Sequence, residues 1–178
     1  MVSLRRVVAL GMVCLTILLV GATVALSANI SDLRGQAVIN LGSRHLGASE
    51  DFQEFNPGLG LGAFLPVFEG RAVAAGEIGF YRNSLDRISV YATGSLDTAI
   101  LAAQRTELRI GLFGGLANYP DDAEKFGDTG VPTIGSVVVV GGAQATLRFD
   151  DRVDFRVRVV PAGNVADAIL TGQIAIRF

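Results

Sequence analysis

The chain has few of the residues on which most metal proteins and many enzymes depend. Its 178 residues include one cysteine, Cys14, one histidine, His45, one lysine, Lys125, and no tryptophan. A lone cysteine excludes an intrachain disulfide and a zinc site built on several thiolates. A single histidine likewise excludes a site built on several imidazoles. The sequence has no cluster of basic residues, which argues against nucleic acid binding. We therefore expect no metal, no cofactor and no nucleic acid partner.

The first 28 residues have the pattern of an export signal. Arg5 and Arg6 are followed by an uncharged apolar run over 7–28, which ends in small residues before the polar Asn29. A basic start, an apolar stretch and a small-residue end predict a secretory signal peptide over 1–28. The remaining 29–178 then form one domain. The apolar run is also long enough to span a bilayer, so an uncleaved anchor is the alternative.

After Asn29 the sequence alternates between apolar and polar residues with period two, which indicates β-strands. The segment 153–159 is the clearest, because valines and a phenylalanine alternate there with Asp154, Arg156 and Arg158. Eight strands are expected, near 36–45, 57–68, 71–82, 87–96, 105–116, 133–149, 152–161 and 168–178. The predicted fold is all-β, a single antiparallel up-and-down β-barrel of about eight strands.

Three details of this strand assignment have their own expectations. The segment 97–104 could form a short helical turn instead of strand. The long sixth strand is expected to bend at Gly141 and Gly142, where glycine permits a bulge. Asp150 and Asp151 are expected to form a tight hairpin turn.

A barrel of this size is either a soluble carrier with its apolar face inward or a membrane barrel with its apolar face toward lipid. Charged residues make up 18% of this chain, below the roughly 25% of soluble domains. Charges of both signs lie on the polar faces, where they can pair inside a narrow lumen. These residues are Glu77, Glu107, Arg109, Arg148, Asp154, Arg156 and Arg158. The composition therefore favours the membrane barrel.

Aromatic residues are expected to form two girdles at the membrane interfaces, as in other membrane barrels. One girdle would consist of Phe68, Phe149, Phe155 and Phe178, and the other of Phe52, Phe55, Phe80, Tyr81 and Tyr119.

The last strand carries a resemblance to a known class of proteins. Leu170, Gly172, Ile174, Ile176 and Phe178 alternate up to the final residue. This pattern resembles the C-terminal signal of Gram-negative outer-membrane β-barrels, which the barrel-assembly machinery recognises. The resemblance implies an outer-membrane location, with outer-membrane lipid, lipopolysaccharide and that machinery as partners. A periplasmic or secreted location is the alternative.

Residues that could support acyl transfer gather at one rim of the predicted barrel. His45 ends the first strand, and Ser84 and Asp86 lie in the second outward loop, so a base, a nucleophile and an orienting acid are all available. This placement is similar to that of the lipid A palmitoyltransferase barrels, which implies His45 as base with Ser84 and Asp86 as partners. The lipid A deacylase barrels are a weaker comparison, because Gly47 stands where their serine would be.

A second resemblance covers residues 43–91. Its motifs are S-x-H, N-E-x-N-P-G-L-G, G-x-Y-x-N-S and S-x-Y, and they resemble those of an uncharacterised family of small exported bacterial and phage proteins. Gln53 departs from the asparagine usual in that family. The rim residues that carry the motifs are Ser43, Glu54, Asn56, Tyr81, Arg82 and Asn83. The same residues are also turn formers, so the resemblance marks a place and implies no reaction.

We therefore expect a small outer-membrane barrel with a structural or surface-interaction role. One alternative is a lipid-modifying enzyme, an acyltransferase or esterase. The other is a soluble periplasmic barrel that binds a small apolar ligand. An acidic loop at 121–128 could hold a divalent cation that bridges lipopolysaccharide, but it lacks the spacing of a calcium loop, and a solvated loop is the expectation.

Overall fold

The structure, a computed structural model, describes residues 30–48, 52–120, 131, 133–162 and 166–178. The expected signal peptide and most of the acidic loop lie outside these residues. Within them, a 3-10 turn η1 (Ile30–Asp32) precedes nine strands. The strands are β1 (Arg34–Leu46), β2 (Gly58–Val67), β3 (Ala72–Arg82), β4 (Ile88–Ala103), β5 (Thr106–Asn118), β6 (Thr133–Ile134), β7 (Val137–Phe149), β8 (Val153–Pro161) and β9 (Ala168–Arg177). No helix in the described ranges is long and apolar enough to cross a membrane.

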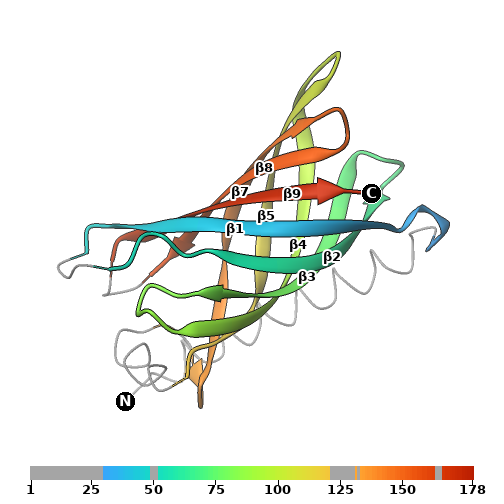
Figure 1. Ribbon diagram of the computed structural model, residues 1–178. Coiled ribbons are helices and arrows are strands. Elements are labelled where there is room, and N and C mark those ends of the chain that lie inside the picture. The colour runs from blue at the N-terminus through green and yellow to red at the C-terminus, as the bar shows by residue number, and fades with distance from the viewer. Residues whose placement is uncertain (1–29, 49–51, 121–130, 132, 163–165) are drawn as a thin grey trace, which may run out of the picture.

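Eight of these strands close into a single antiparallel barrel (Figure 1). Each barrel strand pairs with the next along the chain, and β9 returns to pair with β1. The short β6 pairs with β7 outside this ring, so β5 pairs directly with β7. The prediction of an all-β, up-and-down, eight-stranded barrel is confirmed.

The register fixes the tilt of the strands. Following paired residues once around the barrel from Leu101 leads back to β4 at Val90, eleven positions earlier, and one of these positions is the bulge at Ile100. The stagger around the barrel is thus ten residues. With strands about 4.7 Å apart and a rise of about 3.3 Å per residue, this stagger tilts the strands by about 40°.

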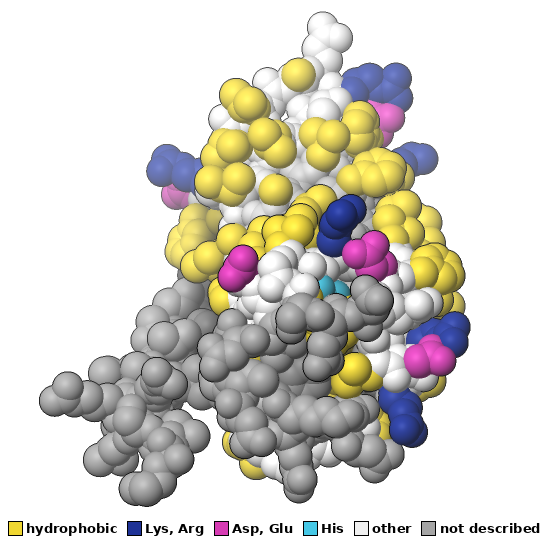
Figure 2. Space-filling model, turned by 90° about the vertical axis from the view of Figure 1, so that its left-hand side faces the viewer, with side chains coloured by type: hydrophobic (Ala, Val, Ile, Leu, Met, Phe, Trp, Pro, Cys, Tyr) yellow, Lys and Arg dark blue, Asp and Glu magenta, His cyan; other side chains and the backbone are white. Residues whose placement is uncertain are grey.

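The two faces of the sheet have opposite character. On β8, Asp154, Arg156 and Arg158 are 1–5% exposed, whereas the alternating Phe155 and Val157 are 47% and 50% exposed. Among the largest fully buried side chains, five are polar: Gln36, Asn83, Thr146, Asp154 and Ser89. Apolar side chains cover much of the outer wall on the face that Figure 2 shows. The core is therefore polar and the surface is apolar.

Two local expectations about the strands were wrong. The segment 97–104 continues β4 to Ala103 instead of forming a helical turn, because its backbone pairs with β5 on the far side of the Ile100 bulge. The sixth predicted strand divides at Gly135, whose φ of 58° suits a turn, into β6 and β7. Pairing of β7 with β5 runs through Gly141 and Gly142 without a shift in register.

The hairpin turn at Asp150 and Asp151 formed as expected. Both residues have positive φ, 50° and 56°, and the amide of Arg152 donates to the carbonyl of Phe149 over 2.9 Å. Two consecutive residues with positive φ define the turn type whose twist matches that of paired strands.

Candidate functional site

The barrel has two distinct ends. The end that carries Phe178 and the short connections 68–71, 104–105 and 150–152 is here termed the turn end. The opposite end, where β1 finishes and the longer connections lie, is the loop end. Every residue predicted for catalysis or for the rim belongs to the loop end, and the predicted lumen charges lie between the two ends.

At the loop end, the chain between β1 and β2 folds back along β1. Pairing between these strands stops at Asn40. Beyond it, the amide of Ser43 donates to the carbonyl of Glu54 over 2.8 Å, and its hydroxyl donates to the Asn56 side-chain oxygen over 2.5 Å. Gly42 makes this approach possible, because a Cβ there would collide with the carbonyl oxygen of Glu54.

Ser84 connects this segment to the turn between β3 and β4. Its hydroxyl lies 3.3 Å from that of Ser43, and its carbonyl accepts from the amide of Gln53 over 3.1 Å. The Asn56 side chain donates to the carbonyl of Gln53 over 3.2 Å. We term these four residues, Ser43, Gln53, Asn56 and Ser84, the rim clasp, because they fasten two loops to the end of β1.

Asn83 organises the turn between β3 and β4 from within. Its side-chain oxygen accepts from the amides of Leu85 and Arg87 over 2.9 and 3.0 Å, and its nitrogen donates to the Ser89 hydroxyl over 2.9 Å. An asparagine that bonds its own turn in this way is a structural device. The motif residue Asn83 therefore has a full set of structural contacts.

Asp86 contacts Arg82 and no member of the rim clasp among the described residues. It forms an exposed ion pair with Arg82, and the hydrogen bond from that guanidinium lowers the pKa of the Asp86 carboxyl below its usual value. Its φ of 66° marks the end of the tight turn. These contacts are those of a turn residue at the surface.

The three residues predicted for catalysis are not joined to one another. His45 stacks on Phe52 with ring centroids 4.3 Å apart, and its buried Nδ1 has no hydrogen-bond partner in the part of the chain that the structure describes. Among the described residues, no hydrogen bond links His45 to Ser84 or Asp86. The hydroxyl of Ser84 contacts Ser43 instead. These contacts therefore do not align a general base with a nucleophile.

The lumen beneath the clasp is lined by tyrosines. Tyr81 and Tyr119 were expected in an outer girdle, but their hydroxyls meet at 2.8 Å, and Tyr81 packs against the buried Tyr91 with ring centroids 5.8 Å apart. The prediction of an outward position was wrong, because Tyr81 lies on the inward face of β3. Asn40 donates to the Tyr91 hydroxyl over 3.3 Å.

Farther in, Glu77 is the meeting point of the lumen network. Its two carboxylate oxygens accept from Arg156 at 3.0 Å and Arg158 at 2.8 Å, and one also accepts from the Thr93 hydroxyl at 3.2 Å. These three partners come from β8 and β4, so Glu77 on β3 ties opposite walls of the barrel together.

Two further groups of ion pairs fill the lumen. Arg109 donates to Asp97 at 2.5 Å and to Glu107 at 2.8 Å. Arg148 donates to Asp154 at 2.8 Å, which also receives a bond from Arg156 at 3.3 Å. Buried charges persist only when they are paired and hydrogen-bonded, and this network pairs most of its members.

Several polar members of this network were not among the lumen residues predicted from the sequence. Asp97, Gln144, Gln36 and Gln173 are buried among the charges. Gln144, for example, donates to Asp97 over 3.2 Å and accepts from Arg158 over 3.1 Å. Their positions on the same alternating face as the charged residues were the available signal.

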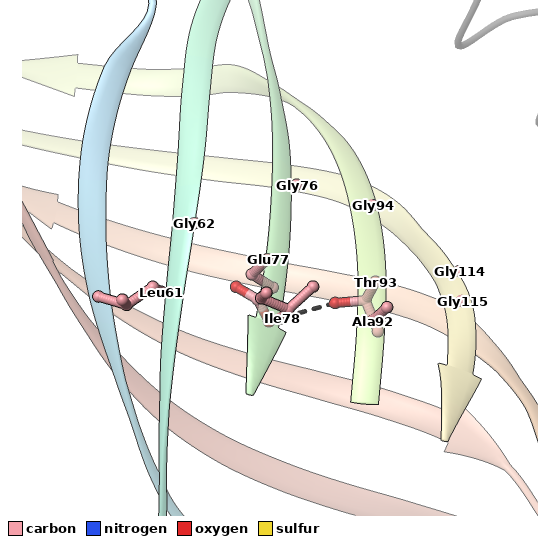
Figure 3. Close-up of a pocket in the computed structure, with 10 residues that line it drawn as sticks. All are labelled: Leu61, Gly62, Gly76, Glu77, Ile78, Ala92, Thr93, Gly94, Gly114 and Gly115. Carbon is pink, nitrogen blue, oxygen red and sulfur yellow. Dashed lines mark hydrogen bonds between the residues drawn. The ribbon is translucent and has the colours of Figure 1, made fainter. Parts of the chain in front are cut away.

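The outer wall carries a shallow apolar groove of about 610 Å³. Leu61, Ile78 and Ala92 border it, and glycines on neighbouring strands form its floor (Figure 3). Gly76 pairs with Gly94 across the sheet, so the wall is smooth at this point. Among the described residues, no group of three or more His, Cys, Asp and Glu side chains could hold a metal ion.

Comparisons with known proteins match solved structures only. No family model and no curated protein sequence matches this chain. The outer membrane protein Ail of Yersinia pestis, solved in a phospholipid bilayer nanodisc, is 12% identical, with 82% of this chain and 99% of that chain covered and a TM-score of 0.45. Neisserial surface protein A is 10% identical, with 82% and 96% covered and a TM-score of 0.44. At such identities, function has to be argued from this chain's own residues.

Proposed function

We propose that this chain is an outer-membrane β-barrel that spans the bilayer and has a structural or surface-interaction role at its loop end. The observation that carries the proposal is the reversal of the two faces. Ile78, Leu112 and Leu116 are 50–69% exposed on the outer wall, whereas Glu77, Arg109 and Arg156 are at most 5% exposed inside. Soluble monomeric proteins rarely expose so large an apolar surface to water.

The dimensions of the barrel suit a bilayer. A strand of ten residues that rises about 3.3 Å per residue and tilts by about 40° crosses roughly 25 Å, the height of the apolar band of membrane barrels. A closed barrel also leaves no strand edge unpaired in lipid. Exposed aromatic side chains lie near both ends, Phe149, Phe155 and Phe178 at one and Phe55 and Phe80 at the other.

The rim clasp supports an interaction role over an enzymatic one. It holds two loops in a fixed arrangement through Ser43, Asn56 and Ser84, which lowers the conformational entropy that a partner would have to remove on binding. Catalysis by His45, Ser84 and Asp86 on a membrane lipid stays a prediction. Replacing His45 by alanine should then abolish lipid remodelling without reducing the yield of folded barrel.

Cell fractionation followed by gel electrophoresis tests the location. The protein should be found in the outer-membrane fraction and should migrate faster without boiling than after it, because a closed barrel resists detergent until heated. A soluble periplasmic product would overturn the proposal and favour a carrier of a small apolar ligand.

Removing the ring of Phe178 tests the proposed recognition by the assembly machinery. The amide and carbonyl of Phe178 bond with Gly35, so the variant Phe178→Ala, which keeps the backbone, separates recognition from folding. We expect impaired assembly in cells but normal refolding in detergent. Equal assembly of the variant and the wild type in cells would contradict a role for the terminal aromatic ring.

A further inference from the structure

We propose that the turn end of the lumen binds a small monovalent inorganic anion, such as chloride, between Arg177 and Gln36. The two residues face each other across β9 and β1 as directly paired positions. Side chains at paired positions of an antiparallel sheet begin about 5 Å apart. Each of them has a buried N–H group, Arg177 Nε and Gln36 Nε2, for which no described residue supplies an acceptor.

The charges inside the barrel do not balance at this point. Five arginines face the lumen against four carboxylates: Arg109, Arg148, Arg156, Arg158 and Arg177 against Glu77, Asp97, Glu107 and Asp154. Among the described residues, Arg177 is the lumen arginine with no carboxylate within 4.0 Å; the other four are all in ion pairs. The surplus charge therefore sits on Arg177.

The surroundings of Arg177 increase the need for an anion. Its guanidinium lies 3.4 Å above the centre of the buried Phe64 ring, an attraction weaker than that of a carboxylate. Arg148 and Arg156 repel its charge, whereas Asp154 and Asp151 attract it. Asp154 already accepts bonds from both Arg148 and Arg156. A partly buried guanidinium without a bonded counter-ion is unfavourable,.

Gln36 has the orientation and the space to complete such a site. Its Oε1 accepts from Arg156 Nη2 over 2.7 Å, which turns Nε2 away as a free donor. The side chain is fully buried. The paired position on β2 is Gly62, where a Cβ would come within 3.0 Å of Nε2, so the glycine leaves room beside the amide. Two donors and an excess positive charge select an anion over a neutral water molecule.

Thermal unfolding in detergent micelles tests the site directly. Chloride is titrated against gluconate at constant ionic strength, and we expect a saturable rise in Tm of about 2–4 °C for the wild type. In Gln36→Glu, a carboxylate stands beside Arg177 and replaces the anion while still accepting from Arg156. We expect this variant to keep its fold and to lose the chloride response.

Two further measurements make the result decisive. Arg177→Met should also lose the response, and Arg105→Gln, which alters an exposed arginine at the same end, should keep it. Crystals grown in bromide should show anomalous density between Arg177 Nε and Gln36 Nε2. A wild-type Tm that does not depend on chloride, an unchanged response in Gln36→Glu, or no bromide at that position would overturn the proposal.

Discussion

Glu77 shows how strongly the stability of a polar core can depend on a single residue. It accepts from two buried arginines and is itself 5% exposed. Glu77→Ala would leave Arg158 with no carboxylate partner, and breaking a buried ion pair costs about 3–5 kcal/mol. We expect a loss of that size in the free energy of unfolding, measured by urea titration of the refolded protein in micelles.

The matched control for Glu77 is the exposed pair of Arg82 and Asp86. Asp86→Asn removes the ion pair and keeps a residue that tolerates the positive φ,. The change should cost at most about 1 kcal/mol, as for other exposed pairs. Equal losses for the two variants would mean that the buried ion pairs of Glu77 stabilise the barrel no more than an exposed pair does.

The ion pair of the turn residue Asp150 should make the stability of the barrel depend on pH in the acid range. Its hydrogen bond from Arg105 lowers the pKa of the Asp150 carboxyl below its usual value. A carboxyl whose pKa is lower in the folded state stabilises the protein at neutral pH, and this contribution is lost as the pH falls below about 4 and through the folded pKa. Asp150→Asn keeps the turn, so its unfolding free energy should fall less between pH 5 and pH 2 than that of the wild type; an identical fall would contradict the assignment.

At the scale of the strand, glycines on the two faces of β3 differ in the space around them. At Gly79, on the inward face, a Cβ would lie 2.7 Å from the Gly60 Cα and 2.8 Å from the Tyr91 ring. At Gly76, on the outward face of the same strand, a Cβ would meet no atom of the described residues within 4 Å. Gly79→Ala should cost about 1–3 kcal/mol through overpacking.

Gly76→Ala is the control for this prediction. Both substitutions remove the same backbone freedom from one strand, so their difference isolates the contacts of the inward Cβ with the Leu59 carbonyl oxygen, the Gly60 Cα and the Tyr91 ring. Gly76→Ala should leave the unfolding free energy unchanged within about 0.5 kcal/mol. Equal costs at both positions would show that the inward face is not closely packed at Gly79.

Period-two alternation was sufficient to predict the eight-stranded barrel and the inward position of its charged residues, because the outer face of the strands is apolar and the inner face is largely polar,. It could not predict the bulge at Ile100, which depends on backbone pairing with a different strand. The rim motifs identified Ser43, Asn56 and Ser84 as a group. Their hydrogen bonds join positions up to 41 residues apart, so a local sequence pattern could not predict how they contact one another.

At the scale of the whole molecule, the character of the outer wall determines whether the barrel is stable in water or in lipid. Leu112 lies in the middle of β5 and is 69% exposed. If the wall faces the hydrocarbon core, Leu112→Arg should cost about 2–4 kcal/mol in lipid vesicles. Ile134 on β6 is 80% exposed at the loop end, and Ile134→Arg should cost no more than about 1 kcal/mol because it lies near or beyond the interface. Both variants are compared with the wild type by urea unfolding in the same vesicles. A soluble barrel would tolerate arginine equally well at both positions, so equal stability of the two variants would contradict a membrane-spanning wall.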